Sequence, residues 1–149
     1  MIGLLQRVSR ASVAVDGHVI AQIEHGLLIM VGVERGDQPA NAVRLAERLL
    51  AYRVFPDEGG RMNLSVRDVG GGILAVPQFT LAADTRTGNR PGFSRAAEPS
   101  AGEALFDQFV DAIKVSGVPH AVGRFGANMQ VTLTNDGPVT FWLQAGTSD

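Results

Sequence analysis

The sequence has no cysteine, one lysine, one tryptophan and three histidines among its 149 residues. The absence of cysteine excludes disulfides and thiolate metal sites, and agrees with the cytoplasmic location that we expect. His18, His25 and His120 lack the spacing and the accompanying ligands of a metal site, so we expect no metal and no other cofactor. No apolar run approaches the roughly 20 residues that span a bilayer, which predicts a soluble protein without a membrane partner.

Conventional catalytic patterns are absent as well. Thr80 and Ser94 have no histidine near them in the sequence, and there is no G-x-S-x-G motif of a serine hydrolase. The run Gly70-Gly71-Gly72 lacks the lysine and hydroxyl of a phosphate-binding loop, so it is interpreted as a turn.

Length and charge limit the organisation and the partners. A chain of 149 residues fits a single domain, which we place over residues 1–149. The net charge of −2 argues against a broadly basic binder of nucleic acid, and we expect no DNA partner. Twelve of the thirteen basic residues are arginine, and Arg86, Arg90 and Arg95 fall in one Gly/Pro-containing loop. Guanidinium groups suit phosphate, but an ordinary solvated loop is the interpretation that the sequence favours.

Hydrophobic periodicity predicts strands in blocks. Strands are expected over 4–15 and 19–23, joined by a hairpin turn at Asp16-Gly17, and over 26–33 and 73–81. The stretch from 118 to 144 is expected to hold further strands, broken at Gly123, Gly126 and Gly137-Pro138.

Two segments have helical spacing. Asp37 is a candidate cap for the first, which has Pro39 in its first turn and apolar positions up to Leu50. Pro99 begins the second, and Gly117 is placed to end it. Strand pair, helix, strands, helix and strands together predict an α+β fold with an antiparallel sheet, not alternating βαβ units.

Asn135-Asp136-Gly137-Pro138 is the least ordinary stretch of the sequence. Proline has no N–H for a sheet ladder, and the three residues before it favour turns, so composition and spacing alone predict a turn.

Three motifs carry a resemblance to a known family: "PQFTLAADTRTGNRPGF" from residue 77, "GRFGANMQV" from residue 123 and "NDGPVTFWLQ" from residue 135. Together they resemble the D-aminoacyl-tRNA deacylases, formerly called D-tyrosyl-tRNA deacylases. The segments "QRVSRASVAVDG" and "RMNLSV" extend the similarity over nearly the whole chain.

The resemblance implies a homodimeric, metal-free enzyme that hydrolyses the ester between a D-amino acid and the 3′-terminal adenosine of tRNA. It also implies that glycyl-tRNA mischarged on alanine tRNA is a substrate. The implied fold is an antiparallel β-barrel-like domain with two main helices packed against it.

Site residues follow from the same resemblance. The first motif places catalytic residues at Gln78, Phe79 and Thr80. The last implies that Gly137-Pro138 is a cis peptide that enters the partner subunit's pocket and rejects L-amino acids. Arg7 matches a residue that holds this step, and Phe125 and Met129 match residues around the terminal adenosine; these five form the substrate-binding set.

Such a chemistry explains why no histidine is needed. An aminoacyl ester is already activated, so backbone N–H groups near Phe79 can stabilise the oxyanion while water or the ribose 2′-hydroxyl attacks.

Pro77 departs from the family pattern, which commonly has serine there. A related group that acts on mischarged L-alanyl-tRNA also has proline at this position, so that activity is an alternative. Phe79 and "NDGPVT" follow the D-specific pattern more closely. A non-catalytic module that binds the tRNA 3′ end is a second alternative.

Overall fold

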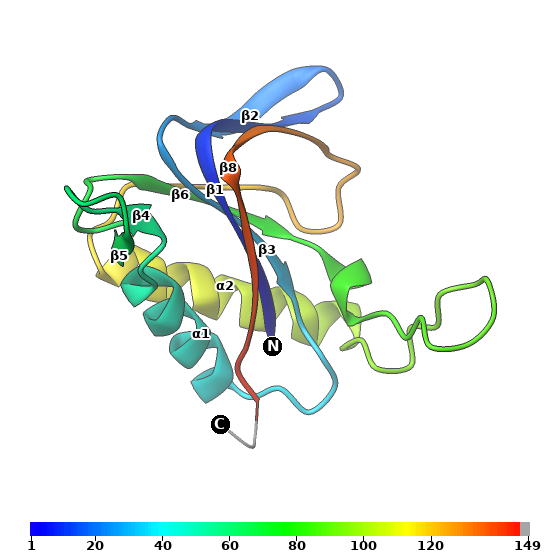
Figure 1. Ribbon diagram of the computed structural model, residues 1–149. Coiled ribbons are helices and arrows are strands. Elements are labelled where there is room, and N and C mark those ends of the chain that lie inside the picture. Colours follow the sequence, from blue (N-terminus) through cyan, green and yellow to red (C-terminus); the bar gives the residue numbers. More distant parts are fainter. Residues whose placement is uncertain (147–149) are drawn as a thin grey trace.

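A curved mixed sheet with two helices packed on one face makes up the computed structural model, which describes residues 1–146 (Figure 1). The helices are α1 (Pro39–Ala51), α2 (Pro99–Val115) and the short 3₁₀ helix η1 (Phe79–Ala82). The strands are β1 (Ile2–Val15), β2 (His18–Ile23), β3 (Gly26–Gly32), β4 (Phe55–Pro56), β5 (Met62–Leu64), β6 (Gly72–Pro77), β7 (His120–Val122) and β8 (Gln130–Gln144).

Strand β1 organises the sheet because it pairs with three neighbours. Its first half pairs with β3 and its second half with β2, while β8 runs antiparallel along almost its whole length. The main path of the sheet is β2-β1-β3-β6-β7. A long strand shared in this way lets the sheet curl upon itself, and the α+β, barrel-like domain with two helices is confirmed.

The expectation of a wholly antiparallel sheet without βαβ units is wrong. Strand β6 pairs parallel to β3, and β7 pairs parallel to β6. Each of these connections contains a helix, α1 in the first and α2 in the second. Parallel neighbours need a crossover of a dozen or more residues, which the helical segments provide. Periodicity in the sequence indicates a strand but carries no information about its direction.

The Gly137-Pro138 step corrects the predicted strand break. Strand β8 continues through it, and the register passes from Val8 opposite Asn135 to Gln6 opposite Thr140. Residues 136 to 139 therefore stand opposite one residue of β1, which makes a wide bulge. The Gly137-Pro138 peptide bond is cis, as predicted.

The helices cover the core with the predicted faces. Asp37 does not cap α1, because its carboxylate accepts the Glu34 N–H at 2.7 Å and Gln38 occupies the cap position. Gly117, with a φ of 80°, follows the end of α2 as expected. In the part of the chain that the structure describes, neither helix is long and apolar enough to cross a membrane. Buried helical residues include Ala42, Leu45, Ala46, Leu49 and Leu50 of α1 and Leu105, Phe106, Phe109 and Ile113 of α2.

Candidate functional site

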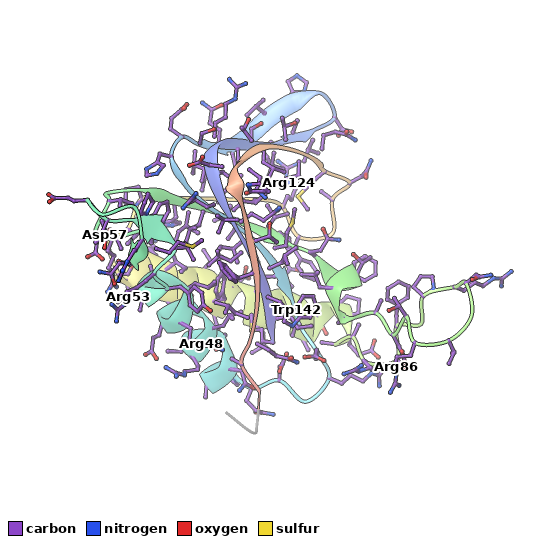
Figure 2. All side chains as sticks on the ribbon, in the orientation of Figure 1. Arg48, Arg53, Asp57, Arg86, Arg124 and Trp142 are labelled. Carbon is purple, nitrogen blue, oxygen red and sulfur yellow. The ribbon has the colours of Figure 1, made fainter. Side chains whose placement is uncertain are left out.

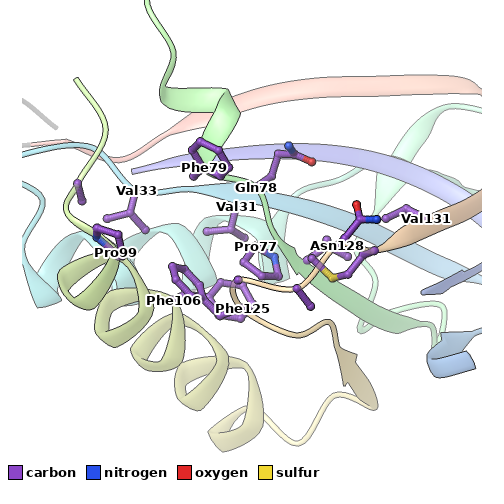
Figure 3. Close-up of a pocket in the computed structure, with 16 residues that line it drawn as sticks. Val31, Val33, Pro77, Gln78, Phe79, Pro99, Phe106, Phe125, Asn128 and Val131 are labelled. Atoms are coloured by element: carbon purple, nitrogen blue, oxygen red, sulfur yellow. The ribbon is translucent and has the colours of Figure 1, made fainter. Parts of the chain in front are cut away.

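A cavity of about 490 Å³ opens where the parallel strands β3 and β6 end, against the beginning of α2 (Figure 3). The carboxyl ends of adjacent parallel strands are a frequent place for ligand sites, because the chain leaves the sheet there in loops. Four segments line it, namely the end of β3, the β6–η1 junction, the start of α2 and the stretch 125–131. The lining residues are Val31, Val33, Val76, Pro77, Gln78, Phe79, Ala97, Pro99, Gly102, Phe106, Phe125, Gly126, Ala127, Asn128, Met129 and Val131.

Within residues 1–146, no ionisable side chain lines this cavity. Its walls are aliphatic and aromatic, with Phe79, Phe106 and Phe125 from three different segments, and its side-chain amides are those of Gln78 and Asn128. An apolar, aromatic cavity with a few amides suits a flat, uncharged ring that also forms hydrogen bonds. Among the described lining residues there is therefore no carboxylate or imidazole that could transfer a proton.

Backbone donors are available beside the cavity at the start of η1. The Gln78 N–H donates to the Val31 carbonyl at 2.7 Å, which ties η1 to the end of β3. Among the residues that the structure describes, neither the Phe79 N–H nor the Thr80 N–H has an acceptor. The first N–H groups of a helix have no partner within it, so this pair can stabilise a negative oxygen.

The side chains around η1 are mutually ordered. The Gln78 Nε2 group donates to the Thr80 hydroxyl. Phe79, 61% exposed, contacts the Phe93 ring at a centroid distance of 5.2 Å. Phe79 therefore stands at the rim of the cavity, where a bound ligand would meet it.

The structure brings together five of the eight predicted site residues and places the other three elsewhere. Gln78, Phe79, Phe125 and Met129 line the cavity, and Thr80 follows immediately on η1. The other three predicted residues do not line the cavity within one chain; they are Arg7, Gly137 and Pro138.

Arg7 instead organises the bulge of β8. Its Nε donates to the Asp136 carbonyl at 3.0 Å and its Nη1 to the Val54 carbonyl at 2.7 Å. The guanidinium also lies 3.6 Å from the Asp136 carboxylate, and the side chain is only 12% exposed. On the other side of the bulge, the Val139 N–H donates to the side-chain oxygen Oδ1 of Asn135 at 3.0 Å. The bulge is therefore held from both ends.

Gly137 is a position that only glycine suits. Its φ is 139°, and an added Cβ would lie 2.6 Å from Val139 Cγ2 and 2.9 Å from the Val139 nitrogen. Gly137 and Pro138 are both exposed, although their neighbour Val139 is buried. The step thus presents backbone to solvent in a fixed orientation.

Sequence reasoning missed the helical wall of the cavity. Pro99, Gly102 and Phe106 of α2 all line it. Phe106 belongs to the buried apolar stripe of α2, and a residue in such a stripe carries no sign in the sequence that part of it faces a cavity. Gly102 did carry a signal, since an isolated glycine inside a helical pattern often marks a close approach.

The perturbed acid groups lie outside the cavity. Hydrogen bonds from Arg86 hold the pKa of Asp84 well below its ordinary value, and Asp84 in turn raises the pKa of Arg86. Hydrogen bonding to Ser65, chiefly to its backbone N–H and less to its hydroxyl, lowers the pKa of Asp68. Within residues 1–146, no three His, Asp or Glu side chains gather in a way that could hold a metal ion.

Fold and cavity together define an α+β domain with a largely apolar cavity and backbone donors beside it. The family model described as D-Tyr-tRNA(Tyr) deacylase matches residues 4–144. The chain is 61% identical over 145 residues to the D-aminoacyl-tRNA deacylase of Alkalilimnicola ehrlichii, covering 97% of each chain. It is 58% identical to that of Vibrio cholerae serotype O1, covering 97% of this chain and all of the relative.

Two solved structures share the fold of this chain. A c-Myc DNA unwinding element binding protein matches with a TM-score of 0.93 and 35% identity, over 99% of this chain and 100% of that one. A probable eukaryotic D-amino acid tRNA deacylase shares the fold, with a TM-score of 0.78 and 17% identity over 95% and 97% of the two chains. The chain therefore belongs to the D-Tyr-tRNA(Tyr) deacylase family, and it is a hydrolase that acts on aminoacyl-tRNA ester bonds.

Proposed function

We propose that this protein hydrolyses the ester between a D-amino acid and the 3′-terminal adenosine of tRNA, with the adenine ring in the cavity. The observation that carries the proposal is the pairing of an uncharged aromatic cavity with two backbone N–H groups that lack acceptors, at Phe79 and Thr80. Phe125 and Met129 would contact the ring, and Gln78 would stand between the ring and the ester.

The reaction needs no protein nucleophile. A water molecule, assisted by the ribose 2′-hydroxyl, adds its oxygen to the ester carbonyl carbon, and the carbonyl oxygen becomes an oxyanion. The Phe79 and Thr80 N–H groups stabilise that charge. Collapse of the tetrahedral intermediate breaks the bond to the ribose 3′-oxygen, which takes up the proton that the water loses. The products are the free amino acid and tRNA.

Selection against L-amino acids would come from a second copy of the chain. In a homodimer, the exposed Gly137-Pro138 step of one subunit would enter the other subunit's site, and its fixed backbone would clash with an L side chain. Support comes from the 3.0 Å hydrogen bond that Arg7 Nε donates to the Asp136 carbonyl, because this bond holds the backbone directly before Gly137 in place. Glycine, without a side chain to reject, would be accepted.

Exposed aromatic side chains support a dimer at the same strand. Phe141 and Trp142 of β8 are 36% and 52% exposed, only a few residues from the step. Figure 2 shows Trp142 on β8. The Phe141 ring also contacts Tyr52, which follows the end of α1, at a centroid distance of 5.8 Å. Adjacent exposed aromatic residues are typical of an interaction surface.

Mischarged L-alanyl-tRNA is the second candidate substrate, because Pro77 lines the cavity where serine is the common residue. Phe79 and the Asn135–Thr140 motif favour the D-specific activity. The two differ in whether an L side chain is rejected.

The test is the rate of amino-acid release from D-tyrosyl-, L-tyrosyl-, glycyl- and L-alanyl-tRNA, each relative to spontaneous hydrolysis. We expect strong acceleration with the D-tyrosyl and glycyl substrates and little with L-tyrosyl-tRNA. Acceleration with L-alanyl-tRNA alone would establish the second candidate. Acceleration with none of the four would leave a module that only binds the tRNA end.

A further inference from the structure

The arginine loop, residues 84–95, is an ordered projection from the domain. Figure 1 shows it leaving the body between η1 and α2. At its base, the Asp84 N–H donates to the Gly92 carbonyl at 2.7 Å and the Gly92 N–H donates back at 2.9 Å. The C-terminal end of the loop is held to the domain by the Arg35 N–H, which donates to the Arg95 carbonyl at 2.9 Å. The direction of the loop is thus set by its base.

The base of the arginine loop lies at the rim of the cavity. The chain enters the loop directly from η1, whose Phe79 lines the cavity, and leaves it toward Pro99 at the start of α2, which also lines it. Phe93 of the loop packs on Phe79 at 5.2 Å between ring centroids. A ligand that fills the cavity and extends outward past Phe79 would therefore run along the loop.

Positive charge is concentrated on this projection. Its ionisable residues are three arginines and one aspartate, in a chain whose net charge is −2. Asp84 binds Arg86 in a two-pronged contact at 2.7 and 2.9 Å, and Arg95 lies 3.7 Å from Glu34. Among the residues that the structure describes, no carboxylate pairs with Arg90. Figure 2 shows Arg86 on this projection, away from the helices and the sheet.

The arrangement matches the chemistry of an RNA 3′ end. The described lining of the cavity has no positive side chain, so it can hold a base and a ribose but cannot neutralise phosphate. The phosphates of the preceding nucleotides must lie outside, where the arginine loop is the adjacent charged element. Guanidinium is the side chain best suited to phosphate oxygens, and such contacts position a nucleic acid without reading its sequence.

We propose that the arginine loop, through Arg90 and Arg86, binds the phosphates of the nucleotides that precede the terminal adenosine of tRNA. This inference rests on the proposed function, since it takes the adenosine to lie in the cavity. Arg86 is pre-oriented by Asp84 and Arg90 remains free to meet a phosphate. The loop would then add affinity for tRNA that a lone aminoacyl-adenosine cannot use.

The first test measures binding of uncharged tRNA by wild type, Arg90→Ala and the double variant Arg86→Ala/Arg90→Ala across a range of salt concentrations. Arg61→Ala is the matched control, because Arg61 is an exposed arginine in the turn between β4 and β5, in another part of the fold. We expect Arg90→Ala to weaken binding about threefold to tenfold at low salt and to reduce the salt slope by about one. The double variant should lose more, and Arg61→Ala should match wild type. Equal affinity and equal slope for all four proteins would overturn the proposal.

The second test compares kcat/KM on D-tyrosyl-tRNA and on D-tyrosyl-adenosine. The loop variants should lose activity on the tRNA substrate only, because the short substrate has no preceding phosphates. Equal losses on both substrates would mean that the loop shapes the cavity, and would overturn the proposal. If wild type hydrolyses neither substrate, the proposed function fails, while the binding measurement still decides the role of the loop.

Discussion

Gly102 offers a way to separate stability from activity at the cavity. It lies in the first turns of α2, where its N–H donates to the Glu98 carbonyl at 2.8 Å, and it is buried against the cavity. An added Cβ would lie 3.5 Å from Phe125 Cζ and 3.9 Å from Cε2, both ordinary van der Waals distances. Alanine therefore fits without displacement of its neighbours.

Gly102→Ala should stabilise the protein while it narrows the site. Replacing glycine by alanine within a helix gains about 0.5–1 kcal/mol, because alanine has less backbone freedom to lose on folding. In a chain of this size, a gain of about 1 kcal/mol corresponds to roughly 2–4 °C in Tm. The methyl group points at Phe125, so we expect kcat/KM to fall by no more than a few fold.

Gly102→Leu should go further and occupy the cavity. The cavity of about 490 Å³ has room for the side chain, so the fold should be retained. The leucine would take the place of the adenine ring, and kcat/KM on D-tyrosyl-tRNA should fall at least about tenfold, the loss that corresponds to about 1.4 kcal/mol.

The assay combines thermal unfolding with initial rates of deacylation. Ala104→Leu, which adds the same side chain at an exposed position of α2, is the matched control and should leave both measurements near wild type. A folded Gly102→Leu protein with unchanged kcat/KM would refute the assignment of the cavity to the adenosine.

Three further predictions concern the machinery around the cavity. Arg7→Ala should lower the free energy of unfolding by about 1.5–3 kcal/mol and reduce activity, because the carbonyls of Val54 and Asp136 lose a charged donor. Denaturant unfolding and rate measurements test this, and unchanged stability and activity would contradict it. Thr80→Ala should keep much of its rate, since backbone donors act in place of the hydroxyl, whereas abolished turnover with a trapped threonyl ester would reverse that judgement. Activity should survive EDTA, and complete loss that zinc restores would show a metal requirement.

Patterns that act over short distances could be predicted from the sequence. The hairpin at Asp16-Gly17 follows from local turn chemistry, and the structure has φ values of 50° and 79° there. The faces of both helices follow from apolar spacing. The residues Gln78, Phe79, Phe125 and Met129 came from motif resemblance, and the structure gathers them in one cavity.

Contacts between distant segments could not be predicted in this way. The parallel direction of β6 beside β3 depends on how α1 crosses the sheet, which periodicity does not encode. The bulge at Gly137-Pro138 looked like a turn, because its partner Arg7 lies far away in the sequence and only the folded sheet brings the two together.

By itself, therefore, the sequence determined the kinds of element, their buried faces, the family motifs and the absence of cysteine chemistry, because each of these depends on residue type and short-range spacing. Only the tertiary structure decided that the strands form a mixed sheet, that Gly102 and Phe106 of α2 wall the cavity, and that the arginine loop stands at its rim through the contact of Phe93 with Phe79. These features arise from packing between segments far apart in the chain, where long-range contacts outweigh local preference.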